Sequence, residues 1–192
     1  IFVDDPRVLN LVHYATDPTG DVYGELMRVC EKAGDHIHGF QLNTSEPIPE
    51  DLKSYKRQFP GHKLVLQVGD LTMRKCGNDP KRIVSGLDMY VALVDYVLFD
   101  RSGGHGKPFS YDFTRELIDL AGSAHPNLKL GIAGGLHAGT IDVISGLLVD
   151  NPNLSIDAES KLRDENEHLD MEKVAQYLQI AFSLSTKAKE PV

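Results

Sequence analysis

The sequence contains no tryptophan, only two cysteines, and no apolar run near the roughly 18 residues that a membrane-spanning helix requires. Cys30 and Cys76 match neither a disulfide framework nor the ligand spacing of a zinc site. No signal-peptide pattern opens the chain. These absences predict a cytoplasmic protein in a reducing setting that has no membrane partner.

An excess of basic residues is missing too. The formal net charge is −8, and Lys and Arg are scattered, so nucleic acid is not expected as a partner. The 192 residues, of which 41% are hydrophobic and 25% charged, suit one globular domain with a sizeable core. We therefore expect a single domain over residues 1–185, followed by a polar tail at 186–192.

What the sequence does have is a regular alternation of apolar runs and helical patterns. Short aliphatic and β-branched runs begin at Val8, His36, Lys63, Asp95, Leu128 and Leu154. Helical patterns with polar faces follow them at 21–33, 48–58, 79–92, 112–124, 138–149 and 168–185. Six such repeats predict an α/β fold made of about six βα units around a parallel sheet.

Two architectures accommodate six βα units. A doubly wound sheet that binds a dinucleotide would carry G-x-G-x-x-G after its first strand, but the loop at 15–24 reads ATDPTGDVYG. An open-sheet nucleotide or flavin binder therefore lacks its fingerprint. The other architecture is a (β/α)8 TIM-barrel-like fold in which the visible strands are numbers 3 to 8. The first residue is Ile1 rather than Met, so we expect an N-terminal region or a partner to supply strands 1 and 2.

Barrels of this type place their chemistry at the carboxyl ends of the strands and bind phosphate after strands 7 and 8. Asp100 ends the apolar run DYVLFD, and a glycine-rich loop follows it directly. Gly134 and Gly135 end the next run, where glycine lets backbone N–H groups approach an anion and the following helix adds its dipole. The sequence thus predicts a ligand-facing carboxylate and an anion site at one mouth.

These segments resemble the phosphoribosylanthranilate isomerase family. LFDRSGGHGKPFSY is similar to the family's strand-6 aspartate and G-G-T-G-K-x-F-D-W loop, with matches at Gly103, Gly104, Gly106, Lys107 and Phe109. IAGGLHAGTI resembles the family's A-G-G-L motif through residues 133–136, and GFQLN resembles its strand-4 motif through Gln41 and Leu42.

The resemblance implies an aldose–ketose isomerase that performs an Amadori rearrangement in tryptophan biosynthesis, without a cofactor and without a metal. It implies that Asp100 is the general acid, which protonates the furanose ring oxygen as the ring opens. The small phosphorylated substrate would be bound by Gly103, Gly104, Gly106, Lys107, Gly134, Gly135, Ser160 and Lys161. Further candidates are Gln41, His105, His137 and Asp157. The expected oligomeric state is a monomer or a homodimer.

The sequence also departs from the family pattern. The family's general base is a cysteine in a strand-1 K-x-C-G motif; RKCGND around Cys76 is similar but follows the fifth strand, where a loop cysteine is the favoured interpretation. In IDAESKLRD, Glu159 and Lys161 replace a serine and a glycine of the family's strand 8. The alternative is a divergent barrel that binds a different phosphorylated or anionic small molecule, with or without catalysis.

Overall fold

The computed structural model describes residues 2–15, 20–102 and 109–189, and within this part six parallel strands form one sheet in the order β1-β2-β3-β4-β5-β6. Every neighbouring pair is parallel. The strands are β1 (Leu11–Ala15), β2 (Gly39–Asn43), β3 (Lys63–Gly69), β4 (Tyr96–Asp100), β5 (Lys129–Ala133) and β6 (Ser155–Ile156).

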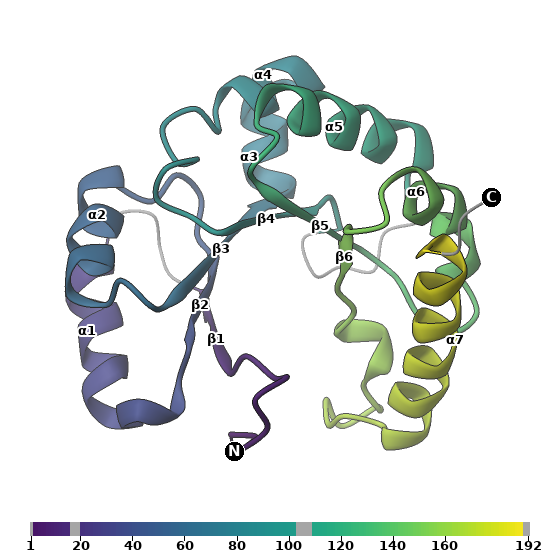
Figure 1. Cartoon of the computed structure of the whole chain (residues 1–192), viewed down its shortest axis with the longest axis horizontal. Helices are drawn as coiled ribbons and strands as arrows, with labels where there is room; N and C mark the ends of the chain where they lie inside the picture. Colours follow the sequence, from purple (N-terminus) through teal and green to yellow (C-terminus); the bar gives the residue numbers. More distant parts are fainter. Residues whose placement is uncertain (1, 16–19, 103–108, 190–192) are drawn as a thin grey trace.

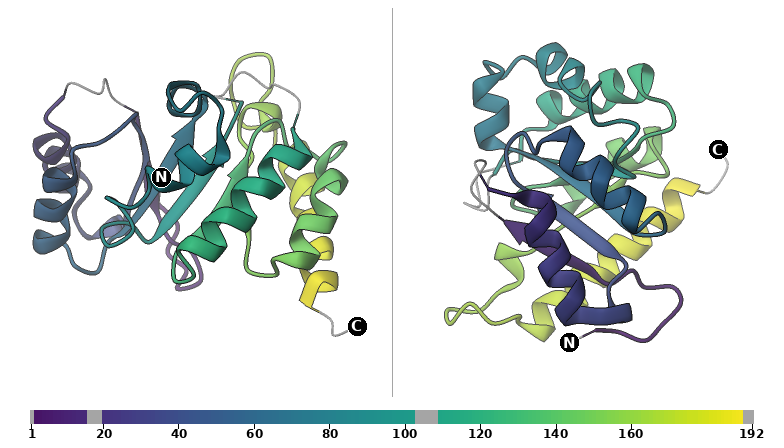
Figure 2. Two further views of the ribbon diagram at one scale, coloured as in Figure 1. Left: turned by 90° about the horizontal axis from the view of Figure 1, so that it is seen from above. Right: turned by 90° about the vertical axis from the view of Figure 1, so that its left-hand side faces the viewer.

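Helices connect successive strands and cover the convex side of the curved sheet (Figure 1). The α-helices are α1 (Val22–Ala33), α2 (Pro49–Gln58), α3 (Asp70–Lys75), α4 (Pro80–Ser85), α5 (Tyr111–Ala124), α6 (Ser145–Asp150) and α7 (Met171–Lys189). Short 3-10 turns are η1 (Gly34–His36), η2 (Ile141–Ile144) and η3 (Ser160–Leu162). Figure 2 shows the same arc from above and from the side.

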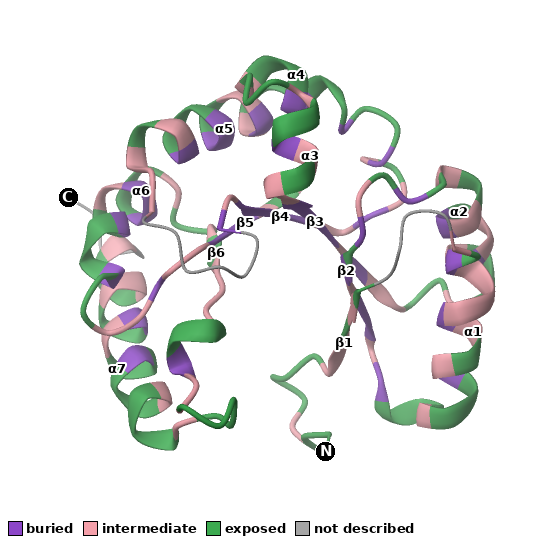
Figure 3. Ribbon diagram, turned by 180° about the vertical axis from the view of Figure 1, so that it is seen from behind, coloured by how far each residue is buried: buried purple, intermediate pink, exposed green. Residues whose placement is uncertain are grey.

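Alternating strand residues separate the core from the concave face. On β3, Leu64, Leu66 and Val68 are buried in the core beneath the helices, whereas Val65 lines a cavity on the concave side. In Figure 3 most of the buried ribbon lies in the strands β2 to β5 and on the inner faces of the helices, whereas β1 and β6 are intermediate or exposed. The concave face is therefore the surface on which inward-pointing polar residues can meet a ligand.

The strand order distinguishes the two architectures. A doubly wound sheet reverses its order at a switch point, whereas these six strands follow one another in sequence with helices on one side, which is compatible with a TIM-barrel-like fold. The prediction of a parallel α/β fold with six βα units is confirmed. The sheet does not close, however: within the described residues β1 pairs only with β2, and β6 only with β5.

Several helix predictions need correction. α3 was not expected, and the helix expected at 79–92 is α-helical only from Pro80 to Ser85, after which turns continue to Leu93. The helix expected at 138–149 begins as the 3-10 turn η2 at Ile141, so several residues separate Gly135 from its first turn. α7 runs to Lys189, into the segment expected to be a polar tail.

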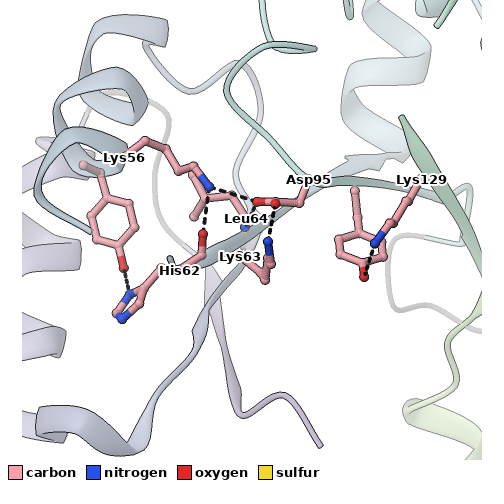
Figure 4. Close-up of polar contacts among 8 residues, drawn as sticks. Lys56, His62, Lys63, Leu64, Asp95 and Lys129 are labelled. Atoms are coloured by element: carbon pink, nitrogen blue, oxygen red, sulfur yellow. Dashed lines mark hydrogen bonds and ion pairs between the residues drawn. The ribbon is translucent and has the colours of Figure 1, made fainter. Parts of the chain in front are cut away.

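At the amino ends of the strands, Asp95 joins three segments. Its carboxylate accepts hydrogen bonds from Lys56 Nζ (3.1 Å), Lys63 Nζ (3.0 Å) and the Leu64 N–H (3.0 Å), as Figure 4 shows. Burial opposes ionisation of Asp95, but the Leu64 N–H and the two ammonium groups outweigh it and lower its pKa. The Asp95 carboxylate therefore ties α2, the start of β3 and the start of β4 together.

Among the described helices, none combines the length and apolar character needed to cross a bilayer.

Candidate functional site

Asp100 lies at the carboxyl end of β4 and is buried, with only 6% of its surface exposed. Oδ1 accepts hydrogen bonds from the Ser102 N–H (3.0 Å) and Ser102 Oγ (2.7 Å), and Oδ2 accepts one from Gln67 Nε2 (3.0 Å). Gln67 Oε1 accepts a hydrogen bond of 3.1 Å from Gln41 Nε2. The carboxylate is thus held in one orientation by Gln67 of β3 and by Ser102 of its own loop, and Gln41 of β2 holds Gln67 in turn.

The register of the strands explains why these side chains meet. Gly69 pairs with Asp100, so Gln67 lies two residues before the neighbour of Asp100 and its side chain faces the same concave side. Gln41 of β2 pairs with Val65, which lies two residues before Gln67 on β3. Three inward-facing polar side chains therefore form a diagonal row across β2, β3 and β4.

A depression of about 40 Å³ opens beside this row at the carboxyl ends of the strands. Asp100, Gln67, Gln41, Gly134, Gly135, Asp157 and Ser160 are among its lining residues. A cavity of about 230 Å³ lies beside it on the concave face, and Gln41 and Asp157 line both spaces. A ligand larger than a water or two must therefore extend over the concave face.

Gly134 brings the backbone after β5 close to Asp100. Its φ is +118°, and a Cβ at this position would lie 3.5 Å from Asp100 Oδ1 and 3.4 Å from Ser102 Cβ. Gly135 also has positive φ, at 65°. The two glycines thus allow a sharp turn over the carboxylate, a conformation that residues with side chains rarely adopt.

The depression has an acidic side on the strand β6 loop. Burial raises the pKa of the Asp157 carboxyl, and the nearby carboxylates of Glu159 and Asp100 raise it further. Glu159 is held by Arg163 at 2.6 Å and lies 3.8 Å from His13 Nδ1. An anionic ligand that enters here would meet carboxylates unless Asp157 keeps its proton.

Tyr177 of α7 is close enough to Asp157 for that carboxylate to affect its pKa. Burial, followed by the Asp157 charge, raises the pKa of Tyr177 to about 12. The buried Tyr177 hydroxyl has no hydrogen-bond partner among the described residues. α7 therefore places an uncharged phenol behind the acidic side of the depression.

The structure brings together many, but not all, of the residues predicted from the sequence. Asp100, Gln41, Gly134, Gly135, Asp157 and Ser160 line one depression. Lys161 is exposed on η3, and His137 Nδ1 accepts a hydrogen bond of 3.1 Å from Gly139 N within its own loop; neither is among the described lining residues. Gly103, Gly104, His105, Gly106 and Lys107 lie outside the described residues.

Two other expectations concern a base and a metal. Cys76 caps the end of α3 and lines a different cavity, so its position does not support the role of base beside Asp100. In the described ranges no group of three or more His, Cys, Asp or Glu side chains could hold a metal ion.

Four residues that line the depression were not predicted from the sequence as site residues. They are His13, Gln67, Ser102 and Glu159. A signal for Gln67 was present, because a single amide interrupts the apolar run KLVLQV at a position facing the concave side. Ser102 stands two residues after Asp100, a spacing at which an aspartate commonly accepts a backbone hydrogen bond.

Comparisons with known proteins inform the fold only. No protein-family model and no curated protein matches this sequence. A solved structure described as catalytic-site mutants of active domain 2 of a chitinase from Pyrococcus furiosus matches with a TM-score of 0.60 and 11% sequence identity. The match covers 93% of this chain and 66% of that one, so this chain spans just under two thirds of its length. Identity this low carries the fold and no activity.

Proposed function

We propose that this chain is a phosphosugar isomerase similar to phosphoribosylanthranilate isomerase, with Asp100 as its general acid. The observation that carries the proposal is the buried, three-fold hydrogen-bonded Asp100 at the carboxyl end of β4. Barrel enzymes place catalytic groups at this end, and buried polar groups with a fixed orientation suit proton transfer. Gly134, Gly135 and Ser160 line the depression at the same mouth, and a substrate phosphate beside them would extend from it onto the concave face.

The reaction requires two proton transfers. Asp100 gives its proton to the ring oxygen as the bond from that oxygen to C1 breaks and the nitrogen lone pair forms an iminium at C1. A base then removes the C2 proton, and the resulting enaminol tautomerises to the ketone at C2. Asp100 is the proposed acid, and the base is to be identified by experiment.

The test is turnover of phosphoribosylanthranilate by the full chain, followed by fluorescence. Wild type should convert the substrate on the order of 1 per second or faster, and Asp100→Asn should lose at least about 100-fold, the usual contribution of a general acid. The control is Asp119→Asn, which changes a surface carboxylate of α5 that is 61% exposed. Equal activity of wild type and Asp100→Asn would contradict the assignment.

The second candidate is a divergent barrel that binds a phosphorylated or anionic small molecule without turning it over. The acidic side favours it, because Glu159 stands where the family pattern has a serine and adds a second carboxylate beside Asp157. Calorimetric binding of ribose 5-phosphate without turnover of phosphoribosylanthranilate would support this candidate over the isomerase.

A further inference from the structure

A second, larger cavity of about 420 Å³ lies at the carboxyl ends of β2 and β3. Its walls come from the loop that follows β2, from α3, and from the segment that runs from α4 to Tyr90. Leu66, Val68, Ile83 and Leu87 form the deep walls, and all four are buried in the core. The walls therefore belong to the packed interior rather than to the surface.

Two contacts fix the shape of the entrance. Tyr90 Oη donates a hydrogen bond of 2.9 Å to the Pro47 carbonyl, which ties the loop after β2 to the segment after α4. Burial, followed by the Glu46 charge, raises the pKa of Tyr90, so the phenol stays a neutral donor. Lys75 Nζ and Glu46 Oε2 form an ion pair of 3.1 Å across the same rim.

The entrance also exposes apolar side chains that a folded surface normally covers. Ile48 is 50% exposed and Met89 is 58% exposed, and both line the cavity. The carboxylate of Glu46 already has its counter-ion in Lys75, so no unpaired charge among the described lining residues calls for an ionic ligand. Apolar walls, a thioether at the mouth and a neutralised rim match an uncharged, polarisable ring.

The volume of the cavity limits the size of the ligand that it can hold. An apolar cavity of about 150 Å³ is enough for one benzene ring, and small-molecule sites range from about 300 to 1,000 Å³. We propose that this cavity is a binding site for an uncharged aromatic compound of about two to three rings. It is separate from the Asp100 depression: Gln67 contributes to the walls of both, but its amide is engaged by Asp100 and Gln41. The proposal thus does not depend on the isomerase activity.

The probe for the test is N-phenyl-1-naphthylamine, an uncharged two-part aromatic whose fluorescence rises in apolar surroundings. The full chain should bind one equivalent saturably, with a Kd in the micromolar range. Met89→Asp should weaken binding at least about tenfold, because it places an unpaired carboxylate at the mouth. The matched control is Met171→Asp on α7, which changes a methionine of 69% exposure that does not line the cavity.

A thiol provides a second, site-specific readout. Cys76 lines the cavity and is partly exposed, whereas Cys30 is buried, so alkylation by iodoacetamide should modify Cys76 first. Saturating probe should slow that modification several-fold, and Cys76→Ser should remove the fast-reacting thiol. Asp100→Asn should bind the probe like wild type.

Two results would overturn the proposal. One is equal probe affinity of Met89→Asp and Met171→Asp, with both variants folded by circular dichroism. The other is full reactivity of Cys76 at saturating probe. If Met89→Asp does not fold, Thr72→Leu, which fills the cavity from α3, takes its place, and unchanged probe affinity in that variant would equally reject the site.

Discussion

Gln67 Nε2 lies 3.0 Å from Asp100 Oδ2 and donates a hydrogen bond to it, while the other end of the same amide accepts a hydrogen bond from Gln41. An amide carries both a donor and an acceptor, so the amide groups of Gln67 and Gln41 can both rotate by about 180° and keep the hydrogen bond between them. After such a rotation, Gln67 Oε1 would accept a hydrogen bond from the O–H of a protonated Asp100. The two amides can therefore form a hydrogen bond with Asp100 whether its carboxyl is ionised or protonated. A general acid, which loses and regains a proton, needs a partner of this kind.

Removing the donor from this row should destabilise the fold. Gln67→Met keeps the length of the side chain but leaves the buried Asp100 without one of its donors, and we expect a loss of about 1–3 kcal/mol in the free energy of unfolding. Urea denaturation at pH 7 measures it. The control, Gln41→Met, removes only the outer, part-buried bond and should cost less. A Gln67→Met loss no greater than that of the control would mean that the Asp100 bond adds no stability.

The raised pKa of Asp157 makes a prediction about pH. A carboxyl whose pKa is higher in the fold than its ordinary value of 3.8 contributes stability that is fully present below that value and is lost as pH rises through the raised pKa. Asp157→Asn cannot ionise, so it should melt higher than wild type at pH 7, by about 2–4 °C if the gain is near 1 kcal/mol. The difference should vanish near pH 3. A difference in melting temperature between the two proteins that stays the same from pH 3 to pH 8 would contradict this account.

The sequence predicts the sheet well because its signals are local. Apolar runs at regular intervals specify βα units, and the end of such a run places Asp100 at the carboxyl edge before any coordinates are known. The site as a whole depends on register, which sequence periodicity does not supply. Gln67 reaches Asp100 only because β3 and β4 pair Gly69 with Asp100.

Short elements are the other source of error. α3 has six residues and η2 has four, too few for a helical period to be recognised in the sequence. After Ser85 the chain continues as turns to Leu93, and the apolar pattern over 79–92 does not distinguish these turns from a helix. For the anion site, the consequence is that the dipole expected immediately after Gly135 is not positioned there.

Gly134 should be sensitive to a single added methyl group. Gly134→Ala places a Cβ on a backbone with φ of +118°, and strain of this kind costs about 1–3 kcal/mol. The turn also lies against Asp100 and Ser102, so the isomerase activity proposed above should fall along with stability. The matched change is Gly122→Ala within α5, where nothing lies within 4 Å of the added Cβ. That variant should gain about 0.4–1 kcal/mol. Equal melting temperatures for the two variants would refute the strain argument.

The amino-end cluster around Asp95 should govern acid stability. The pKa of Asp95 is lowered in the fold, so its stabilisation is present above the ordinary value of 3.8 and is lost as pH falls through the lower folded value. Asp95→Asn should therefore cost about 1–3 kcal/mol at pH 7, since Lys56, Lys63 and the Leu64 N–H lose a charged acceptor that is only 21% exposed.

The same comparison at low pH separates charge from shape. Wild type and Asp95→Asn should approach equal stability near pH 2–3, because the protonated aspartic acid resembles the amide in size and charge. Asp119→Asn, whose carboxylate is 61% exposed and 3.8 Å from Arg115, should change stability by less than about 0.5 kcal/mol at either pH. Urea titrations at pH 3 and pH 7 for the three proteins decide the matter. A deficit of Asp95→Asn that persists undiminished at pH 3 would show that packing, and not the charge of Asp95, joins these strands.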